Sequence, residues 1–418
     1  MAGACHNDQD SVRAQCSGRT VSPFFGDPRM NQSLQPVAVR ERIQILDILR
    51  GFAVFGILAV NIVGFASPAF FPGYMPEPAA EWDEFAGDLM LLLAEGKFYT
   101  IFSFLFGLGF SVQFARAEGK GRDLKSIYPR RLWILFGLGV LHSILLWYGD
   151  ILRLYALLGF ALFMFRNRSN RTLAIWAGIL LLISFLFLAL VGGPNANEPV
   201  PGLDMVAMAR EAYSSASFLD VMVFQAFFSP FSFLAIALFQ GLSVMALFLL
   251  GLLAGRLRIL ERVGEVRTLF VRAGWLGLLI GLPLNALYVY SSSAWLQSVA
   301  FVFGAPVLSA AYVAGLALFL QTGLGQRALA PIANVGRMAL TNYVLQSLIC
   351  SLLFFGFGFG LYEEIGAAGL WGVTFIVYLC QIPLSAWWLA KFQFGPLEWL
   401  WRSLTYGQWQ PMLKRPGM

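Results

Sequence analysis

His142 is the residue of this chain best suited to acid–base chemistry. An unperturbed histidine has a pKa of about 6.5, so it can accept and release protons near neutral pH. His142 follows Leu132 by ten residues, which puts it roughly 15 Å along a helix that begins there. We predict that His142 is a catalytic general base. The alternative is a neutral histidine that hydrogen-bonds a neighbouring helix.

Five further polar residues are expected to gather near one interface of the same helices. Two acids and two bases among them would form a neutral cluster that binds a polar substrate, because charges inside a membrane are functional candidates by default. Asp150 would also be catalytic, by orienting the acceptor or His142 together with Glu95 and Lys97. Ordinary pairing of interfacial side chains is the alternative. The five residues are Asn61, Glu95, Lys97, Asp150 and Arg153.

A second polar stripe lies in the segment GRMALTNYVLQSL, residues 336–348. Asn342 and Gln346 are four residues apart and therefore share one helix face, with Thr341 and Ser347 flanking it. We predict that this face binds substrate and that Gln346 lies near His142 in depth. Hydrogen bonding between helices explains the stripe equally well.

Arg50 and Arg337 lie near the ends of their predicted helices. Guanidinium groups bind phosphate oxygens through paired hydrogen bonds, so the two arginines are candidates for holding the phosphates of a cytosolic donor. Anchoring by anionic lipid headgroups is the competing interpretation.

Membrane helices must position these side chains. The chain is 58% hydrophobic and 12% charged, and its mean hydropathy is +0.69; soluble domains carry about 25% charged residues. Spans of about 20 apolar residues predict an all-α, polytopic membrane bundle of about ten transmembrane helices. The helices are expected over 45–67, 86–115, 132–148, 151–166, 172–192, 222–253, 270–290, 297–322, 336–358 and 368–390.

Loop charges set the predicted orientation. Basic clusters follow the second, fourth and sixth helices, whereas the loops after the first and ninth are acidic, so both termini are expected in the cytoplasm. Residues 1–41 are interpreted as a disordered tail, or as sequence upstream of a true start at Met30. Residues 42–407 would form one transmembrane domain, and 408–418 a short cytoplasmic tail.

The remaining composition argues against two classes of function. The net charge of +6 is spread over short loop clusters, which does not indicate a nucleic-acid partner. Only two histidines occur, and none of the four cysteines forms a C-x-x-C pair, so no metal site is expected.

Four sequence blocks resemble the YeiB-like bacterial membrane proteins, a family of unknown function. The blocks are LDILRGFAVFGILAVNI (46–62), EGKFYTIFSFLFGLGFS (95–111), RRLWILFGLGVLHSILLWYGDILRLYALLGF (130–160) and FQFGPLEWLWRSLTYG (392–407). The resemblance extends from about Arg42 to Gly407. That family is similar to a wider group of transmembrane acyltransferases, which includes the lysosomal heparan-glucosaminide N-acetyltransferase and bacterial enzymes that O-acetylate polysaccharides.

The resemblance implies passage of an acyl group from cytosolic acyl-CoA, most simply acetyl-CoA, across a bacterial inner membrane. The acceptor would be a glycan, a lipid or a small molecule, and a homodimer is left open. Asp47 and Arg50 match the D-x-x-R start of the first helix in that group, so both join Arg337 as donor-binding candidates. Asn61 stands where the polysaccharide enzymes carry a catalytic histidine, and His142 would take that role from a different helix.

The leading hypothesis is therefore a membrane acyltransferase with His142 as general base. A transporter or exporter of a small metabolite would use the same buried polar groups as a binding site. Movement of unmodified substrate without an acyl donor would distinguish it. A non-catalytic envelope scaffold is the third class, and it would tolerate single substitutions in the polar cluster.

Overall fold

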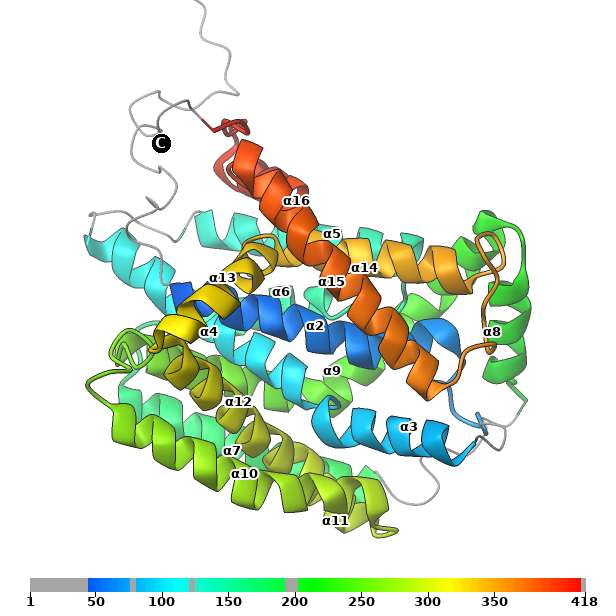
Figure 1. The fold of residues 1–418 in the computed structure, drawn as a ribbon, viewed down its shortest axis with the longest axis horizontal. Helices are drawn as coiled ribbons and strands as arrows, with labels where there is room; N and C mark the ends of the chain where they lie inside the picture. The colour runs from blue at the N-terminus through cyan, green and yellow to red at the C-terminus, as the bar shows by residue number, and fades with distance from the viewer. Residues whose placement is uncertain (1–43, 76–79, 120–124, 126, 192–201, 415–418) are drawn as a thin grey trace, which may run out of the picture. The chain divides into compact units, whose positions relative to one another are not determined.

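The computed structural model describes residues 44–75, 80–119, 125, 127–191 and 202–414; the expected N-terminal tail lies outside them. The described residues form helices and no strand, which confirms the all-α class (Figure 1). The helices are α2 (Gln44–Ala66), α3 (Glu81–Leu93), α4 (Lys97–Gly119), α5 (Ile127–Leu145), α6 (Leu152–Met164), α7 (Asn170–Val191), α8 (Met205–Ser214), α9 (Phe218–Arg256), α10 (Arg267–Tyr290), α11 (Ala294–Val299), the π-helix η2 (Ala300–Gly304), α12 (Ala305–Leu320), α13 (Gly323–Arg337), α14 (Ala339–Phe354), α15 (Ala367–Lys391) and α16 (Pro396–Tyr406).

Seven spans in the described part of the chain are long and apolar enough to cross a membrane, or eight if α13 and α14 form one bent span. This agrees with a polytopic membrane bundle. Two of the ten expected spans, 132–148 and 151–166, correspond to α5 and α6, and neither of these helices is among the seven. The 13 residues of α6 rise only about 20 Å, less than the roughly 30 Å of a bilayer core. The count of ten and the location of the termini stay predictions.

The helices differ in how much of their surface is buried. In Figure 1, α2 runs through the interior, where it packs against α4, α13, α14 and α15. By contrast, α7 exposes large apolar side chains such as Ile175, Leu182 and Leu190. A helix that is apolar all round and exposed is the pattern expected where lipid tails provide the solvent.

Helices α4 and α9 approach each other through glycine. A Cβ added at Gly107 would overlap the carbonyl oxygen of Phe248, and one at Gly251 would overlap that of Phe104. Small residues permit this contact because the two backbones meet directly, and such contacts drive helix association in membranes. Helix α9 of this pair also packs against α5 and α6.

The single helix expected over 86–115 is broken into α3 and α4. Residues 94–96 form the break, and Gly96 adopts a φ of +80°, a conformation that glycine reaches without steric cost. The freed carbonyl groups find side-chain donors: Lys97 Nζ lies 2.9 Å from Leu91 O, and Tyr312 Oη lies 3.0 Å from Leu93 O. The two carbonyl groups that the break exposes therefore both have hydrogen-bond donors.

The start of α14 is held by a distant residue. One Glu398 oxygen accepts hydrogen bonds from the backbone amides of Leu340 and Thr341 at 2.7 and 3.1 Å, and the other accepts from Thr341 Oγ1 at 2.6 Å. A carboxylate at a helix N-terminus satisfies amides that have no partner within the helix. Helix α16 thus determines where α14 begins, after a 78° bend from α13.

Candidate functional site

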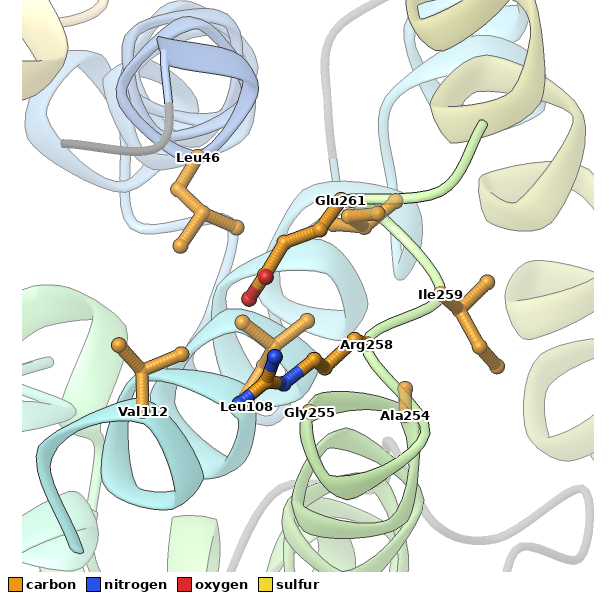
Figure 2. Close-up of a pocket in the computed structure, with 9 residues that line it drawn as sticks. Leu46, Leu108, Val112, Ala254, Gly255, Arg258, Ile259 and Glu261 are labelled. Atoms are coloured by element: carbon orange, nitrogen blue, oxygen red, sulfur yellow. The ribbon is translucent and has the colours of Figure 1, made fainter. Parts of the chain in front are cut away.

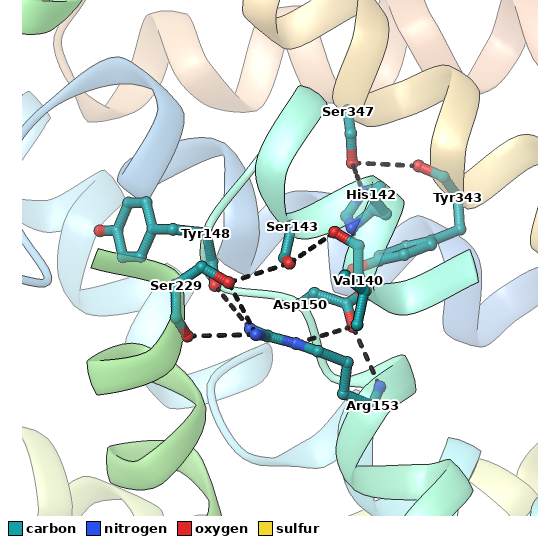
Figure 3. Close-up of polar contacts among 9 residues, drawn as sticks. All are labelled: Val140, His142, Ser143, Tyr148, Asp150, Arg153, Ser229, Tyr343 and Ser347. Atoms are coloured by element: carbon teal, nitrogen blue, oxygen red, sulfur yellow. Dashed lines mark hydrogen bonds and ion pairs between the residues drawn. The ribbon is translucent and has the colours of Figure 1, made fainter. Parts of the chain in front are cut away.

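His142 lies between a carboxylate and a hydroxyl group. Its Nδ1 is 2.9 Å from Asp150 Oδ2, and its Nε2 is 2.9 Å from Ser347 Oγ (Figure 3). All three side chains are buried, with relative exposures of 4% for His142, 0% for Asp150 and 2% for Ser347. A histidine held in this way has one nitrogen beside an acid and the other in contact with a hydroxyl group.

A tight turn brings Asp150 back to His142. Helix α5 ends at Leu145, and the amides of Leu146 and Trp147 both donate to the His142 carbonyl at 3.0 Å. The chain then reverses, and Asp150 Oδ1 accepts a 3.0 Å hydrogen bond from the Arg153 amide in the first turn of α6. Asp150 therefore caps α6, where the helix dipole favours a negative charge.

Gly139 makes room for this carboxylate. It lies on α5 one turn before His142, and a Cβ built there would stand 2.7 Å from Asp150 Oδ1 and 2.9 Å from the Arg153 amide nitrogen. Any larger residue at this position must displace the capped turn. The sequence does not single out Gly139, because its role depends on a residue eleven positions later.

Arg153 balances the charge of Asp150 inside the bundle. Its Nε lies 3.7 Å from Asp150 Oδ1, and its terminal nitrogens donate to Ser229 Oγ at 2.7 Å and to Tyr148 O at 3.2 Å. Ser229 Oγ donates in turn to Ser143 Oγ at 2.9 Å. A buried ion pair needs hydrogen bonds of this kind, because an unpaired charge is costly to bury.

The two faces of α14 have different partners. Ser347 faces His142, and the Tyr343 ring one turn earlier lies 4.9 Å from the imidazole ring. On the other face, Gln346 Nε2 donates to Gln381 Oε1 at 2.8 Å, and Asn342 Nδ2 donates to Ser385 Oγ at 3.0 Å. Asn342 and Gln346 therefore connect α14 to α15, which matches the helix-bonding interpretation of this stripe. Gln346 directly precedes Ser347, whose hydroxyl group contacts His142; its depth in a membrane stays a prediction.

The five residues expected in one cluster are divided by the structure. Asp150 and Arg153 join His142, whereas Lys97 and Glu95 lie at the α3–α4 break, where Glu95 interacts electrostatically with Lys97. Asn61 is half-buried on α2.

A second functional candidate is a group of arginines, Arg50, Arg131 and Arg402, which we call the arginine end. Arg131 stacks on the Trp401 ring at 3.9 Å, and the charges of Arg402 and Arg50 both repel it. Arg50 also pairs with Asp47 at 3.2 Å. Sequence reasoning counted Arg131 among the loop charges and overlooked Arg402. The block at 392–407 contains Arg402 and also Trp401, the ring on which Arg131 stacks.

Arg337 and a small hollow adjoin this region. Arg337 follows Gly336, whose Cβ position would overlap Asp47 O, and its guanidinium lies 3.5 Å from Asn334 Oδ1. Figure 2 shows the hollow, which is lined by Leu46 of α2, by α4 and by the turn after α9 that carries Arg258 and Glu261. Leu46 lies about one turn before Arg50 on α2. The donor-binding candidates Asp47, Arg50 and Arg337 thus lie on α2 and α13, two helices that pack together.

Comparison with known proteins identifies relatives along nearly the whole chain. The family model described as "Protein of unknown function (DUF418)" matches residues 254–408. The uncharacterised protein YxaH of Bacillus subtilis is 35% identical over 405 residues, covering 92% of this chain and 99% of the relative. An uncharacterised 39.9 kDa protein in the amylase 3′ region of Bacillus acidopullulyticus is 31% identical over 402 residues, covering 91% and 98%. The uncharacterised YeiB of Escherichia coli is 30% identical over 386 residues, covering 87% and 96%. The resemblance read from the sequence blocks is thereby confirmed, and the chain belongs to the YeiB-like DUF418 family.

Proposed function

We propose that this protein is an acyltransferase of the bacterial inner membrane, which moves an acyl group from acyl-CoA to a hydroxyl or amine acceptor. The observation that carries the proposal is the buried His142, held at 2.9 Å from Asp150 on one side and from a hydroxyl group on the other. Acyl transfer needs a base that removes a proton from the attacking group, and this arrangement supplies one.

The pairing with Asp150 explains how His142 would act. A carboxylate that accepts a hydrogen bond from Nδ1 keeps the proton there, so Nε2 is free to accept a proton from the attacking group. The same carboxylate stabilises the imidazolium that forms. Arg153 and the α6 amide hold Asp150 in place, so its geometry does not have to be built during the reaction.

The arginine end would bind the donor. CoA carries several phosphates, and clustered guanidinium groups bind phosphate oxygens strongly. Arg131 and His142 lie on the same helix, α5, eleven residues apart, which corresponds to roughly 16 Å of helix. The extended arm of CoA would follow α5 inward from the phosphates, which would place the thioester near His142. Asp47 and Arg337 would support this site, and acetyl-CoA is the simplest donor.

Calorimetry on the protein in nanodiscs tests donor binding. We expect wild type to bind acetyl-CoA, and Arg131→Ala to weaken binding by roughly tenfold or more through the loss of one phosphate contact. Arg131→Lys keeps the positive charge, and Arg210→Ala removes an exposed arginine on α8, so both serve as matched controls. Equal affinity in all four proteins, or no binding of any acyl-CoA, would remove the donor site from the proposal.

A transporter is the second candidate, and the α3–α4 break favours it. Broken helices in membranes are typical of solute sites, and here a fully buried Lys97 and the nearby Glu95 occupy the break. The π-helix η2 faces the same region, since Phe301 lies 3.5 Å from the Cβ position of Gly96. Uptake or export of an unmodified solute by proteoliposomes without acyl-CoA would favour the transporter.

A further inference from the structure

We infer that Ser347 is a covalent nucleophile and that the acyl group passes through an acyl-Ser347 ester. This inference rests on the proposed acyltransferase function and adds a residue and an intermediate to it. The observation is that Ser347, His142 and Asp150 lie in series in the order hydroxyl, imidazole, carboxylate: Ser347 Oγ hydrogen-bonds His142 Nε2 at 2.9 Å, and His142 Nδ1 lies 2.9 Å from Asp150 Oδ2. That order is the arrangement by which a weakly nucleophilic serine becomes reactive.

The serine contacts the histidine as well as its own helix, and the contact with the histidine is the shorter one. A serine within a helix ordinarily donates to the carbonyl four residues earlier, and Ser347 Oγ does lie 3.3 Å from Tyr343 O. Its contact with His142 Nε2 is shorter, at 2.9 Å. The neighbouring Ser351 shows the ordinary case, because its hydroxyl donates to Ser347 O at 2.9 Å and to Leu146 O at 3.1 Å.

The rest of the cluster sets the proton positions that a nucleophilic serine requires. Asp150 Oδ1 accepts a 3.0 Å hydrogen bond from the Arg153 amide and lies 3.7 Å from the Arg153 guanidinium, so the carboxyl group is fixed in position and has a positive charge beside it. A carboxylate at Nδ1 leaves Nε2 unprotonated, and Nε2 is the atom that meets the Ser347 hydroxyl. Proton transfer from Ser347 to His142 therefore needs no rearrangement of either side chain.

The two half-reactions balance with His142 as the only proton carrier. In the first, Ser347 Oγ attacks the thioester carbonyl carbon while Nε2 takes the hydroxyl proton. The carbon–sulfur bond breaks, and the CoA thiolate takes that proton. In the second, the acceptor hydroxyl or amine attacks the ester carbonyl and gives its proton to Nε2. The bond to Oγ then breaks, and Oγ regains a proton from Nε2.

A covalent step also fits the closed geometry of this site. The three side chains are nearly inaccessible, so donor and acceptor reach them only after the surrounding helices separate. The 78° bend between α13 and α14 is a natural place for such movement. An acyl-Ser347 intermediate lets the donor leave before the acceptor arrives, and one small site can then serve both in turn.

Radiolabelled acetyl-CoA tests the intermediate in the protein in nanodiscs. After an acid quench, we expect wild type to retain protein-bound acetyl, located on Ser347 by tandem mass spectrometry. Ser347→Ala should lose this label and release CoA roughly 10³-fold more slowly, because removing one member of such a unit disables the whole unit. Ser351→Ala, one turn further along the same helix, is the matched control and should keep both. Ser347→Cys should form a thioester that neutral hydroxylamine cleaves.

The outcomes separate the inference from the function on which it rests. Acetyl on another residue, or CoA release by Ser347→Ala within about threefold of wild type, would overturn the covalent step. If His142→Ala then loses CoA release while Ser347→Ala keeps it, direct transfer with His142 as base stands. If wild type neither binds acetyl-CoA nor releases CoA, the acyltransferase proposal fails and the acyl-serine fails with it.

Discussion

The two faces of α14 carry similar small polar side chains but make very different contacts. On one face, Ser347 meets His142, which in turn meets Asp150, so a hydroxyl proton has a route to a base. On the other, Gln346 bonds Gln381, and Asn342 bonds Ser385, so amides and hydroxyls join α14 to α15. The difference shows that burial of polar groups does not itself mark a reactive site. The proposed function needs, in addition, a base in contact with a hydroxyl group.

The α3–α4 break extends the same lesson to charged residues. Lys97 is fully buried there, yet its side-chain nitrogen donates to a carbonyl group that the broken helix leaves unpaired. Asp150 and Arg153 are equally buried but hold a histidine between two helices. Substitutions that separate these regions by their effects are therefore the sharpest tests.

Asp150→Asn should have the largest effect on the His142 face. The amide is nearly the same size as the carboxylate, but it can donate to Nδ1 and so favours the wrong tautomer of His142. We expect CoA release to fall by roughly 10³- to 10⁴-fold with the fold retained. Thiol release from acetyl-CoA measures the activity, and thermal unfolding in detergent checks the fold; full activity in a folded variant would contradict the role of Asp150.

Gly139→Ala should damage the same face through packing. The added methyl group would stand 2.7 Å from Asp150 Oδ1, so the capped turn must shift. We expect a loss of stability of about 1–3 kcal/mol, as for other overpacked interiors, together with lower CoA release. Gly137→Ala is the control, because nothing lies within 4 Å of its Cβ position. Equal melting temperatures and activities for the two variants would refute the close contact.

Gln346→Leu tests the other face of α14. The change leaves Gln381 Oε1 without its 2.8 Å donor, which should cost about 0.5–2 kcal/mol in stability. CoA release should remain close to that of wild type at a temperature where the variant is folded. Loss of activity without loss of stability would give this face a role in substrate binding and would weaken the contrast between the two faces.

Arg210→Ala should have the smallest effect. Arg210 of α8 donates to both Glu363 oxygens, at 2.7 and 2.9 Å, but the arginine side chain is half exposed. Surface ion pairs contribute about 0.2–1 kcal/mol and are screened by salt. The melting temperature should drop slightly at low salt and converge with that of wild type at high salt. A large drop that persists at high salt would show that α8 has a structural role that this ion pair does not explain.

The sequence identifies residue types that are capable of acid–base chemistry, but it does not show which residues they contact. His142 and Asp150 stood out because an ionisable group in an apolar segment is costly to bury. Their direct contact depends on the turn over 146–151, which a pattern of apolar residues does not reveal. Ser347 was visible only as a neighbour of the Asn342–Gln346 stripe, because the face of α14 that meets α5 is decided by packing between distant segments.

The same limit applies to the helix boundaries. The apolar pattern predicted long apolar helices, but the pattern continues without interruption through Gly96. There the backbone adopts a left-handed conformation that separates α3 from α4. The start of α14 depends on Glu398, more than fifty residues later, so local sequence could not place it. Arg402 was overlooked for a similar reason, since it joins Arg131 and Arg50 only after α16 packs on α5.

The most direct measurement of the central claim is CoA thiol release from acetyl-CoA by wild type and His142→Ala in nanodiscs. Glu95→Gln, which changes a charged residue at the α3–α4 break, serves as the matched comparison. We predict steady release by wild type and Glu95→Gln, and a loss of roughly 10³-fold or more in His142→Ala. Equal release by wild type and His142→Ala would contradict the account, as would no release by wild type with any acyl-CoA.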